Sequence, residues 1–316
     1  MSEQDPTVTL IIPTYNSSAT LRLALESALA QDLHDLEVWV VGDACTDKSA
    51  DVIASMQDAR IHWVNLAVNS GGPAVPRNEG LKRAGGRYIA YLGHDDLWFP
   101  DHLSGLVNAL DRTKGDFGYS LGVCVGPRGV TQAFAAGEKP MRWTRPLSPS
   151  NWLHRRDLMD RIGPWNQQVK LGSDAEFLQR VQDSHARLVY QPRLSSIKFP
   201  AEFWRMYNRK GGLPQEPYVE AMLRDPGSLR MELLTQAATV FANRETLTET
   251  SALGLPAPLR ILARMACDLY GRERWPLNGI LYRLWRRRAG LSKNLALNSE
   301  RGPGSDRIGR IGDGPR

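Results

Sequence analysis

Polar residues that could carry out chemistry recur where apolar, strand-length segments end in the first half of the chain. Three clusters directly follow such segments: Pro13-Thr14-Tyr15-Asn16, Asp43-Ala44-Cys45-Thr46-Asp47 and His94-Asp95-Asp96. A fourth, Ser173-Asp174-Ala175-Glu176, opens a stretch with helical periodicity. In an open α/β sheet, ligands bind at the carboxyl ends of the strands. The four clusters therefore predict one active site.

Asp95 and Asp96 are the candidate metal ligands. Mg²⁺ and Mn²⁺ take hard oxygen ligands, and a diphosphate would supply the others. A cation there would neutralise charge on a phosphate leaving group. The alternative is that Asp96 caps the helix starting after Pro100, or that both residues only decorate a loop. His94 is expected to orient a phosphate or a carboxylate, or to pack, because an oxygen-rich site does not favour a histidine ligand.

Asp174 is the candidate general base. A carboxylate in the first turn of a helix lies at the positive end of the helix dipole, which favours its ionised form, and it can accept a proton from a substrate hydroxyl. The alternative is plain capping, in which Ser173 and Glu176 form a capping box and Asp174 is a favourable first-turn acid. On the local sequence alone, capping is the favoured interpretation.

A nucleoside site is expected at Pro13, Tyr15, Asp43 and Arg77. Asp43 can accept a hydrogen bond from the N3–H of a pyrimidine or from an exocyclic group of a purine, and Arg77 can meet a base carbonyl or a phosphate. Pro13 and Tyr15 can form an apolar platform for a base, or can simply plug the end of a strand.

The elements that must position these residues alternate regularly. Short β-branched strands are expected at 8–12, 36–41, 61–64 and 88–92, separated by helices at 21–29, 48–56 and 76–84, with Ser17 or Ser18 as the first N-cap. This order predicts a parallel central sheet with helices on both faces. Apolar runs at 119–125 and 130–135 then predict a hairpin and a mixed strand order. Helices are also expected near 152–160 and from 173 to about 182.

The chain beyond residue 200 changes character. Wide apolar faces predict helices at 229–241, 259–270 and 277–288, whereas residues 298–316 are rich in Gly, Arg and Asp and are expected to be disordered. We therefore expect a catalytic domain over 1–200, a helical extension over 201–297 and a tail over 298–316. Packing against the catalytic domain, an acceptor site, dimer formation and contact with a membrane surface are all open roles for the extension.

Charge and cysteine content narrow the range of expected partners, sites and cellular locations. The net charge is +6, and residues 259–316 hold 13 basic and 5 acidic side chains, so the excess is C-terminal. No zinc-finger spacing, RNP-like motif or basic zipper occurs, and nucleic acid is not an expected partner. Cys45, Cys124 and Cys267 match neither a zinc site nor a disulfide framework. With no signal-peptide pattern and no run of 18 apolar residues, a cytoplasmic location is expected, with peripheral contact at the inner membrane surface through the basic helices.

Five segments occur in this order along the chain: Pro-Thr-Tyr-Asn, Val-Gly-Asp-Ala-Cys-Thr-Asp, Asn-Ser-Gly-Gly-Pro-Ala-Val-Pro-Arg-Asn-Glu-Gly, Gly-His-Asp-Asp-Leu-Trp and Gly-Ser-Asp-Ala-Glu-Phe. Taken together, they resemble the family 2 glycosyltransferases of GT-A fold, and the match runs from about Thr7 to Pro200. The resemblance implies inverting transfer of a sugar from a nucleotide diphosphate to a hydroxyl of a glycan, a lipid-linked or another acceptor, with a divalent cation, Mn²⁺ or Mg²⁺. It implies nucleoside contacts at Pro13, Tyr15, Asp43 and Arg77, metal binding at Asp95 and a catalytic base at Asp174, which reverses the local interpretation.

Two departures from the family pattern stand out. Gly42-Asp43-Ala44-Cys45 replaces the frequent Asp-Asp-Gly-Ser, and Gly93 replaces the first carboxylate of the Asp-x-Asp motif. The Gln-x-x-Arg-Trp signature of processive synthases is missing, which favours a single transfer. The alternative function is a nucleotide-sugar or glycan-binding protein that has lost transferase activity with Gly93. A nucleotidyltransferase or a dinucleotide oxidoreductase would need a glycine-rich loop where Pro13-Thr14-Tyr15-Asn16 stands.

Overall fold

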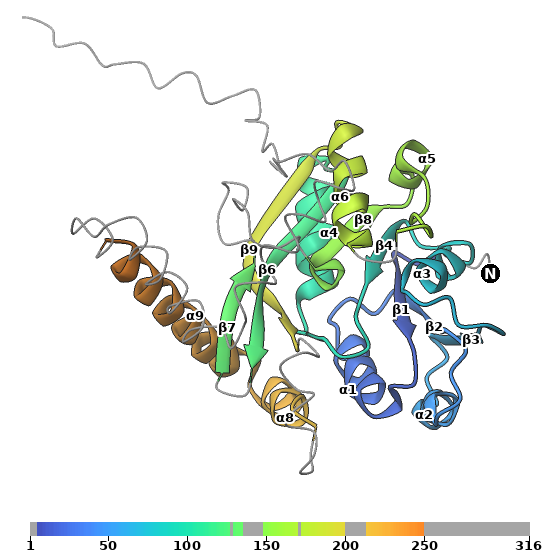
Figure 1. Cartoon of the computed structure of the whole chain (residues 1–316), viewed down its shortest axis with the longest axis horizontal. Coiled ribbons are helices and arrows are strands. Elements are labelled where there is room, and N and C mark those ends of the chain that lie inside the picture. Colours follow the sequence, from blue (N-terminus) through green and yellow to red (C-terminus); the bar gives the residue numbers. More distant parts are fainter. Residues whose placement is uncertain (1–4, 127–128, 135–147, 170–171, 200–212, 250–316) are drawn as a thin grey trace, which may run out of the picture.

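The computed structural model of the chain describes residues 5–126, 129–134, 148–169, 172–199 and 213–249 (Figure 1). Four parallel strands form the first half of its sheet, as the sequence predicts. They are β1 (Val8–Thr14), β2 (Leu36–Gly42), β3 (Ile61–Asn65) and β4 (Tyr88–Tyr91), connected by α1 (Ser18–Leu29), α2 (Ser49–Met56) and α3 (Ala74–Leu81). Because the strands are parallel, the loops that follow β1, β2 and β4 leave the sheet at one edge.

The second half of the sheet is mixed, as the change in sequence pattern predicts. Its strands are β5 (Leu97–Trp98), β6 (Phe117–Gly126), β7 (Gly129–Phe134), β8 (Trp152–Arg155) and β9 (Leu188–Lys198). The strand order is β3-β2-β1-β4-β8-β6-β9-β5, with β7 paired to β6 as the predicted antiparallel hairpin. β8 runs antiparallel to both β4 and β6, whereas β9 runs parallel to β6.

Helices cover both faces of the sheet because successive strand residues point to opposite sides. Leu10 and Ile12 of β1 pack in a core with α1 and with α4 (His102–Thr113), whereas Ile11 packs on the other face with α6 (Ser173–Asp183) and α5 (Leu158–Ile162). Burying these apolar side chains contributes about 25 cal/mol per Å² removed from water, so both layers stabilise the sheet that carries the polar loops.

The C-terminal helices α8 (Glu216–Arg224) and α9 (Pro226–Glu249) pack on the far part of the sheet. Val219 and Leu233 share a core with Val123 of β6, and α9 runs beside β7 (Figure 1). Gln236 Oε1 accepts a hydrogen bond from Val130 N at 2.9 Å. The helices expected at 259–270 and 277–288 and the tail at 298–316 lie outside the described residues. Within the described ranges, no helix is both long and apolar enough to cross a bilayer.

The predicted helix near 152–160 is wrong over its first part. Trp152–Arg155 is strand β8, and only Leu158–Ile162 is helical. Trp152 and Leu153 are fully buried in the cores on opposite faces of the sheet. A strand that is buried on both faces has no alternation of apolar and polar residues, so its periodicity cannot be told from that of a short buried helix.

The predicted serine caps of α1 are also wrong in their chemistry. Ser17 occupies the N-cap position without a side-chain capping bond, and its Oγ donates to Tyr15 O at 2.8 Å. Asp47 caps the helix instead, because its Oδ2 accepts from Ser18 N at 2.8 Å while its Oδ1 accepts from Ser49 N at 3.1 Å in α2. Burial opposes ionisation of this carboxyl, but the hydrogen bonds from Ser49 and Ser18 outweigh it and lower the pKa of Asp47.

Candidate active site

The loops after β1, β2 and β4 are held together at the carboxyl edge of the parallel strands. Asp43 N, after β2, donates to Thr14 O of β1 at 2.8 Å, and His94 Nδ1, after β4, lies 3.2 Å from Pro13 O. Pro13, Asp43 and His94 therefore share one edge, as predicted. His94 bonds to the main chain of β1, which gives it a role in joining the loops.

Asp43 is almost fully buried and is held by the loop before α3. Its Oδ1 accepts from Ser70 N at 2.9 Å and its Oδ2 from Ser70 Oγ at 3.0 Å, while its main-chain oxygen accepts from Asn69 Nδ2 at 2.9 Å. A carboxylate has about four lone-pair sites, so each oxygen keeps capacity for a ligand donor. These bonds fix the orientation of Asp43 and connect β2 to α3.

Tyr15 is 51% exposed beside this edge, which leaves its ring accessible to a ligand. The next residue, Asn16, has a φ of 45°, a left-handed conformation that asparagine tolerates better than most residues. Its Oδ1 accepts from Thr46 N at 2.8 Å and from Asp47 N at 3.3 Å. The turn after β1 is thus tied to the loop after β2.

Asp95 and Asp96 lie in a tight turn after β4, where Asp96 N donates to Gly93 O at 3.0 Å. A Cβ placed on Gly93 would lie 3.0 Å from Asp95 Oδ1 and 3.0 Å from Asp96 Oδ2. The two carboxylates therefore converge on the space above Gly93. A side chain at position 93 would have to displace them.

Asp96 faces the interior of the protein. It is fully buried, and it accepts hydrogen bonds from Ser150 Oγ at 2.5 Å, Lys198 Nζ at 3.2 Å and Phe199 N at 3.3 Å. Burial raises the pKa of Asp96, and Lys198 opposes that rise. Burial likewise disfavours the charge on Lys198, but the carboxylates of Asp96 and Asp95 outweigh it and raise the pKa of Lys198. These contacts make Asp96 an anchor of the turn.

In the turn after β4, Asp95 offers an oxygen atom that fits a hard cation. Asp95 is partly exposed, and its Oδ1 borders the space above Gly93, so it can bind a cation whose other ligands are diphosphate and water oxygens. Asp96 Oδ2 borders the same space but already accepts from Ser150 and Lys198. Among the described residues, no three His, Cys, Asp or Glu side chains gather as a metal-binding group.

Asp174 lies in the first turn of α6, but the predicted capping box is wrong. The N-cap residue is Gly172 with a φ of 78°, its oxygen accepts from Glu176 N at 3.1 Å, and no side chain caps the helix. Ser173 is already helical, and Glu176 pairs with Arg180 at 2.7 Å. Asp174 instead accepts a hydrogen bond at Oδ1 from Arg77 Nη1 at 2.8 Å.

Arg77 therefore connects the predicted base to α3, which follows the loop that holds Asp43. It lies on α3, a short distance along the chain from Ser70, which holds Asp43. Its side chain is 9% exposed, and its guanidinium lies 4.2 Å from the centre of the Trp165 ring. The sequence predicts a ligand contact for Arg77, and the structure places one of its nitrogen atoms on Asp174.

Several residues that shape the site were not found from the sequence. Ser150 and Lys198 reach Asp96 across 54 and 102 positions of the chain, and Trp165 meets Arg77 through a loop without a recognisable motif. No local pattern marks such contacts. Ser70 is different, because it stands in the Asn-Ser-Gly-Gly segment that already points to the family.

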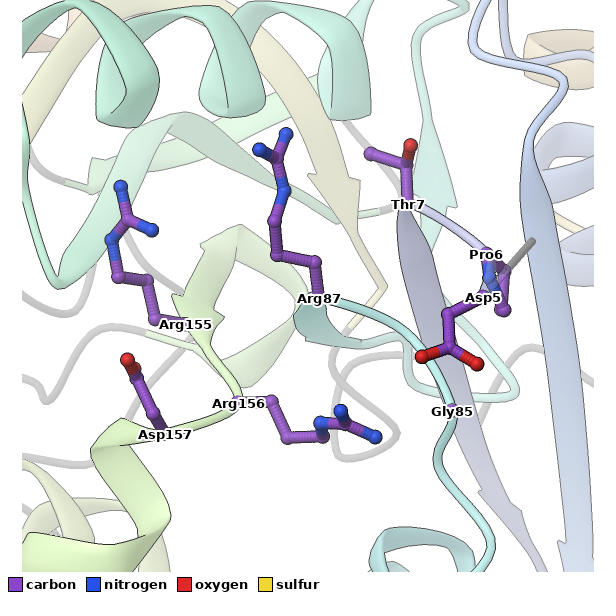
Figure 2. A pocket seen from close by; sticks show the side chains of 8 residues that line it. All are labelled: Asp5, Pro6, Thr7, Gly85, Arg87, Arg155, Arg156 and Asp157. Carbon is purple, nitrogen blue, oxygen red and sulfur yellow. The ribbon is translucent and has the colours of Figure 1, made fainter.

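A depression of about 530 Å³ lies at the opposite edge of the sheet (Figure 2). Thr7 and Arg87, which precede β1 and β4, line it together with Arg155, Arg156 and Asp157. The arginines are engaged within the protein: Arg87 pairs with Asp111 at 3.0 Å, and Arg155 and Arg156 donate to Gly115 O and Ala84 O. None of Asp43, Asp95 and Asp174 lines this depression.

Comparison with known proteins identifies the fold. A family model described as Glycosyl transferase family 2 matches residues 9–163. The UDP-Glc:alpha-D-GlcNAc-diphosphoundecaprenol beta-1,3-glucosyltransferase WfaP of Escherichia coli is 36% identical over 113 residues, which cover 36% of this chain and 45% of WfaP. The curated relatives are matched over half of their length or less.

Two solved structures share the fold over most of this chain. S. aureus TarS 1-349 in complex with UDP-GlcNAc has a TM-score of 0.53 and 20% identity, covering 85% of this chain and 82% of TarS. The mannosyltransferase PcManGT from Pyrobaculum calidifontis, in complex with GDP-Man and Mn²⁺, has a TM-score of 0.53 and 21% identity over 90% of this chain and 89% of its own. The mixed sheet and its flanking helices are the GT-A fold of glycosyltransferases.

Proposed function

Since residues 9–163 make this chain a member of glycosyl transferase family 2, we propose that it is a glycosyltransferase that moves one sugar from a nucleotide diphosphate donor to an acceptor hydroxyl with inversion. The observation that carries the proposal is the pairing of Asp174 with Arg77 beside the edge where Asp43 and Asp95 lie. It puts a carboxylate from α6 next to the loops expected to hold the nucleotide.

The nucleotide end of the donor is assigned to the loops after β1 and β2. Tyr15, which is 51% exposed, offers an aromatic ring for a base, whereas Pro13 is buried within β1, and Asp43 offers carboxylate oxygens whose orientation Ser70 fixes. His94, bonded to Pro13 O, borders the same edge. The named ligands of TarS and PcManGT, UDP-GlcNAc and GDP-Man, support a nucleotide-sugar donor here.

A divalent cation, Mn²⁺ or Mg²⁺, is assigned to Asp95, and the Mn²⁺ complex of PcManGT supports this assignment. Such a cation would neutralise the charge that gathers on the departing diphosphate. Asp96, which the sequence also offers as a ligand, is assigned to hold the turn through Ser150 and Lys198.

Asp174 is assigned as the general base of the transfer. It takes the proton of the acceptor hydroxyl as that oxygen forms a bond to the anomeric carbon, and the bond from this carbon to the diphosphate oxygen breaks on the opposite face. One displacement with one base inverts the configuration. The Asp174 side chain is 31% exposed, so an acceptor can reach it.

Replacing Asp174 by Asn tests the assignment. We expect sugar transfer to fall by about 100- to 10,000-fold, because the base is lost, while nucleotide binding is kept. Calorimetry with UDP, GDP and TDP, each with and without Mn²⁺, first finds the nucleotide, and transfer from the matching nucleotide-sugar is then measured. Equal loss of binding and transfer, or full retention of transfer, would contradict the role.

Replacing Asp95 by Ala tests the metal site separately. We expect the variant to bind the nucleotide equally with and without Mn²⁺, because the oxygen that borders the space above Gly93 is gone. Asp111→Ala, at the opposite edge of the sheet beside Arg87, is the control and should titrate like the wild type. An unchanged Mn²⁺ dependence in Asp95→Ala removes Asp95 from the metal site.

The acceptor is proposed to be the hydroxyl of a glycan, a lipid-linked or another molecule, and the diphosphoundecaprenol in the name of WfaP supports the lipid-linked class. The basic stretch at 277–288 is proposed to contact the inner membrane surface or a second copy of the chain. Gly93 favours one alternative, a nucleotide-sugar-binding protein without transferase activity. Nucleotide binding without transfer in the wild type would select that alternative.

A further inference from the structure

Arg77 is unusually confined for a residue expected to bind a ligand. It is 8% exposed, and its Nη1 donates to Asp174 Oδ1 at 2.8 Å, joining α3 to α6 across 97 positions of the chain. An ion pair with a buried arginine has a well-defined geometry, because the planar guanidinium presents its donors in a fixed arrangement. The position of Asp174 is therefore tied to that of Arg77.

The guanidinium is in turn held by Trp165. Its central carbon lies 4.2 Å from the centre of the Trp165 ring and 5.9 Å from that of Tyr91, distances at which a cation is attracted to an aromatic face. Trp165 also stacks on Phe177, one turn after Asp174 in α6, with ring centres 4.2 Å apart. The support beneath Arg77 is thus continuous with the helix that carries Asp174.

Asn78, the residue after Arg77, fixes Trp165 from the other side. Its Nδ2 donates to Trp165 O at 2.8 Å, and its Oδ1 accepts from Trp165 N at 2.8 Å. Asn78 is buried, so these bonds exchange little with water. Two adjacent residues of α3 therefore hold different parts of this arrangement: Asn78 holds Trp165, and Arg77 holds the carboxylate of Asp174.

The α6 helix offers Asp174 a competing position. The first N–H groups of a helix attract a first-turn carboxylate, which can fold back onto them. No side chain caps α6, and Asp174 Oδ1 points to Arg77 instead. Arg77 therefore decides which way the carboxylate faces.

We propose that Arg77 is a positioning residue, which acts through Asp174 by fixing the carboxylate toward the acceptor, and that recognition of the nucleoside does not depend on it. The inference rests on the proposed function, because it assigns Arg77 a part in the same transfer. A misplacement of about 1 Å at a reacting group can cost about 100-fold in rate. The contribution of Arg77 is therefore expected in kcat.

The kinetic test compares Arg77→Met with Arg83→Met. Arg83 follows α3, pairs with Glu79 and lies over the ring of Trp39 at 5.6 Å. Like Arg77, it therefore makes both an ion pair and a cation–π contact, but it does not pair with Asp174. We expect Arg77→Met to lower kcat by about 100-fold with unchanged nucleotide affinity, and Arg83→Met to match the wild type. Weakened nucleotide binding with unchanged kcat in Arg77→Met would overturn the inference.

Two further variants separate positioning from folding. Free guanidinium should restore part of the activity of Arg77→Ala, which a merely unfolded variant would not show. In the Asp174→Asn background, Arg77→Met should cause no additional loss of kcat, because residues that act as a unit are not additive. Fully additive losses, or no rescue by guanidinium, would contradict the proposal.

A crystal structure of Arg77→Met keeps this inference distinct from the proposed function. We expect Asp174 to turn toward the N–H groups at the start of α6, whatever reaction the protein catalyses. An Asp174 carboxylate that stays in place refutes the positioning role. A wild-type protein that transfers no sugar, with Asp174 displaced in the variant, refutes only the proposed function.

Discussion

At the level of single residues, Lys198 holds the turn after β4 that contains Asp95 and Asp96. Its ammonium, on a side chain that is 34% exposed, is the cation beside the fully buried carboxylate of Asp96. Removing one partner of a buried pair leaves the other charge uncompensated. The two residues therefore form a unit whose halves should not be changed separately.

Lys198→Met tests this unit. We expect the free energy of unfolding to fall by about 2 kcal/mol, below the range for fully buried pairs because the Lys198 side chain is partly exposed. Urea unfolding followed by circular dichroism measures the loss. Adding Asp96→Asn should recover most of it, since the buried charge is then gone. A double variant as unstable as Lys198→Met would show that the pairing does not matter.

Individual site residues could be found from the sequence only where a motif carries them. Asp43, Asp95 and Asp174 stand in segments typical of the family, and the structure places the first two at one strand edge. The capping box predicted at Ser173 is wrong. The Ser-x-x-Glu spacing is typical of capping boxes, but Gly172 occupies the N-cap position of α6 in a left-handed conformation. The contacts of Asp96 could not be predicted, because Ser150 and Lys198 lie too far along the chain for a local sequence pattern to connect them.

Among the elements, α1 and α2 begin at one shared carboxylate. Asp47 Oδ2 accepts from Ser18 N, and its Oδ1 accepts from the N and Oγ of Ser49. Each helix start has N–H groups without a partner inside the helix, so Asp47 satisfies donors of both. The loop after β2 is consequently fixed to the start of α1.

Asp47→Ala should destabilise the protein by about 2 kcal/mol, because removing one capping residue costs about 1 kcal/mol per helix. Thermal unfolding followed by calorimetry measures this effect. Asp51→Ala, in the first turn of α2 and without these capping bonds, is the matched control and should change the stability far less. Equal losses in the two variants would argue against double capping.

The elements were predictable where strands and helices alternate regularly along the chain. The strands and helices from β1 to β4 alternate in chain order, and their bounds differ from the prediction by a few residues. β8 was assigned to a helix because it is buried on both faces, and β5 was missed because it has only two residues, Leu97 and Trp98. Both depend on strand partners far along the chain.

At the scale of the whole molecule, two buried histidines make stability depend on pH. Burial lowers the pKa of His102 to about 3 and that of His154 to about 4. The unfolded chain binds protons at these rings below about pH 6.5, whereas the folded chain does not until much lower pH. The stability they provide is complete above pH 6.5 and is lost as the pH falls toward their folded pKa values.

We therefore expect the free energy of unfolding to decrease from about pH 6.5 to about pH 5, with up to about 1.4 kcal/mol per pH unit from each histidine. Urea titrations across this range measure the slope. His154→Gln removes one titrating ring and should give a shallower slope than the wild type. Parallel slopes would show that His154 binds no extra proton on unfolding.

The acidic turn is completed by a strand made about a hundred residues later. β5 directly follows Asp96 and pairs with β9, where Leu97 faces Ile197 and Trp98 faces Ser196. During synthesis, the first four strands can therefore associate before the ribosome has delivered the segment that locks this turn. Nascent chains that stop short of β9 should show protease-resistant β1–β4 packing while the Asp95 turn is still open to cleavage. On the proposed function, donor recognition therefore becomes possible only after β9 has paired with β5.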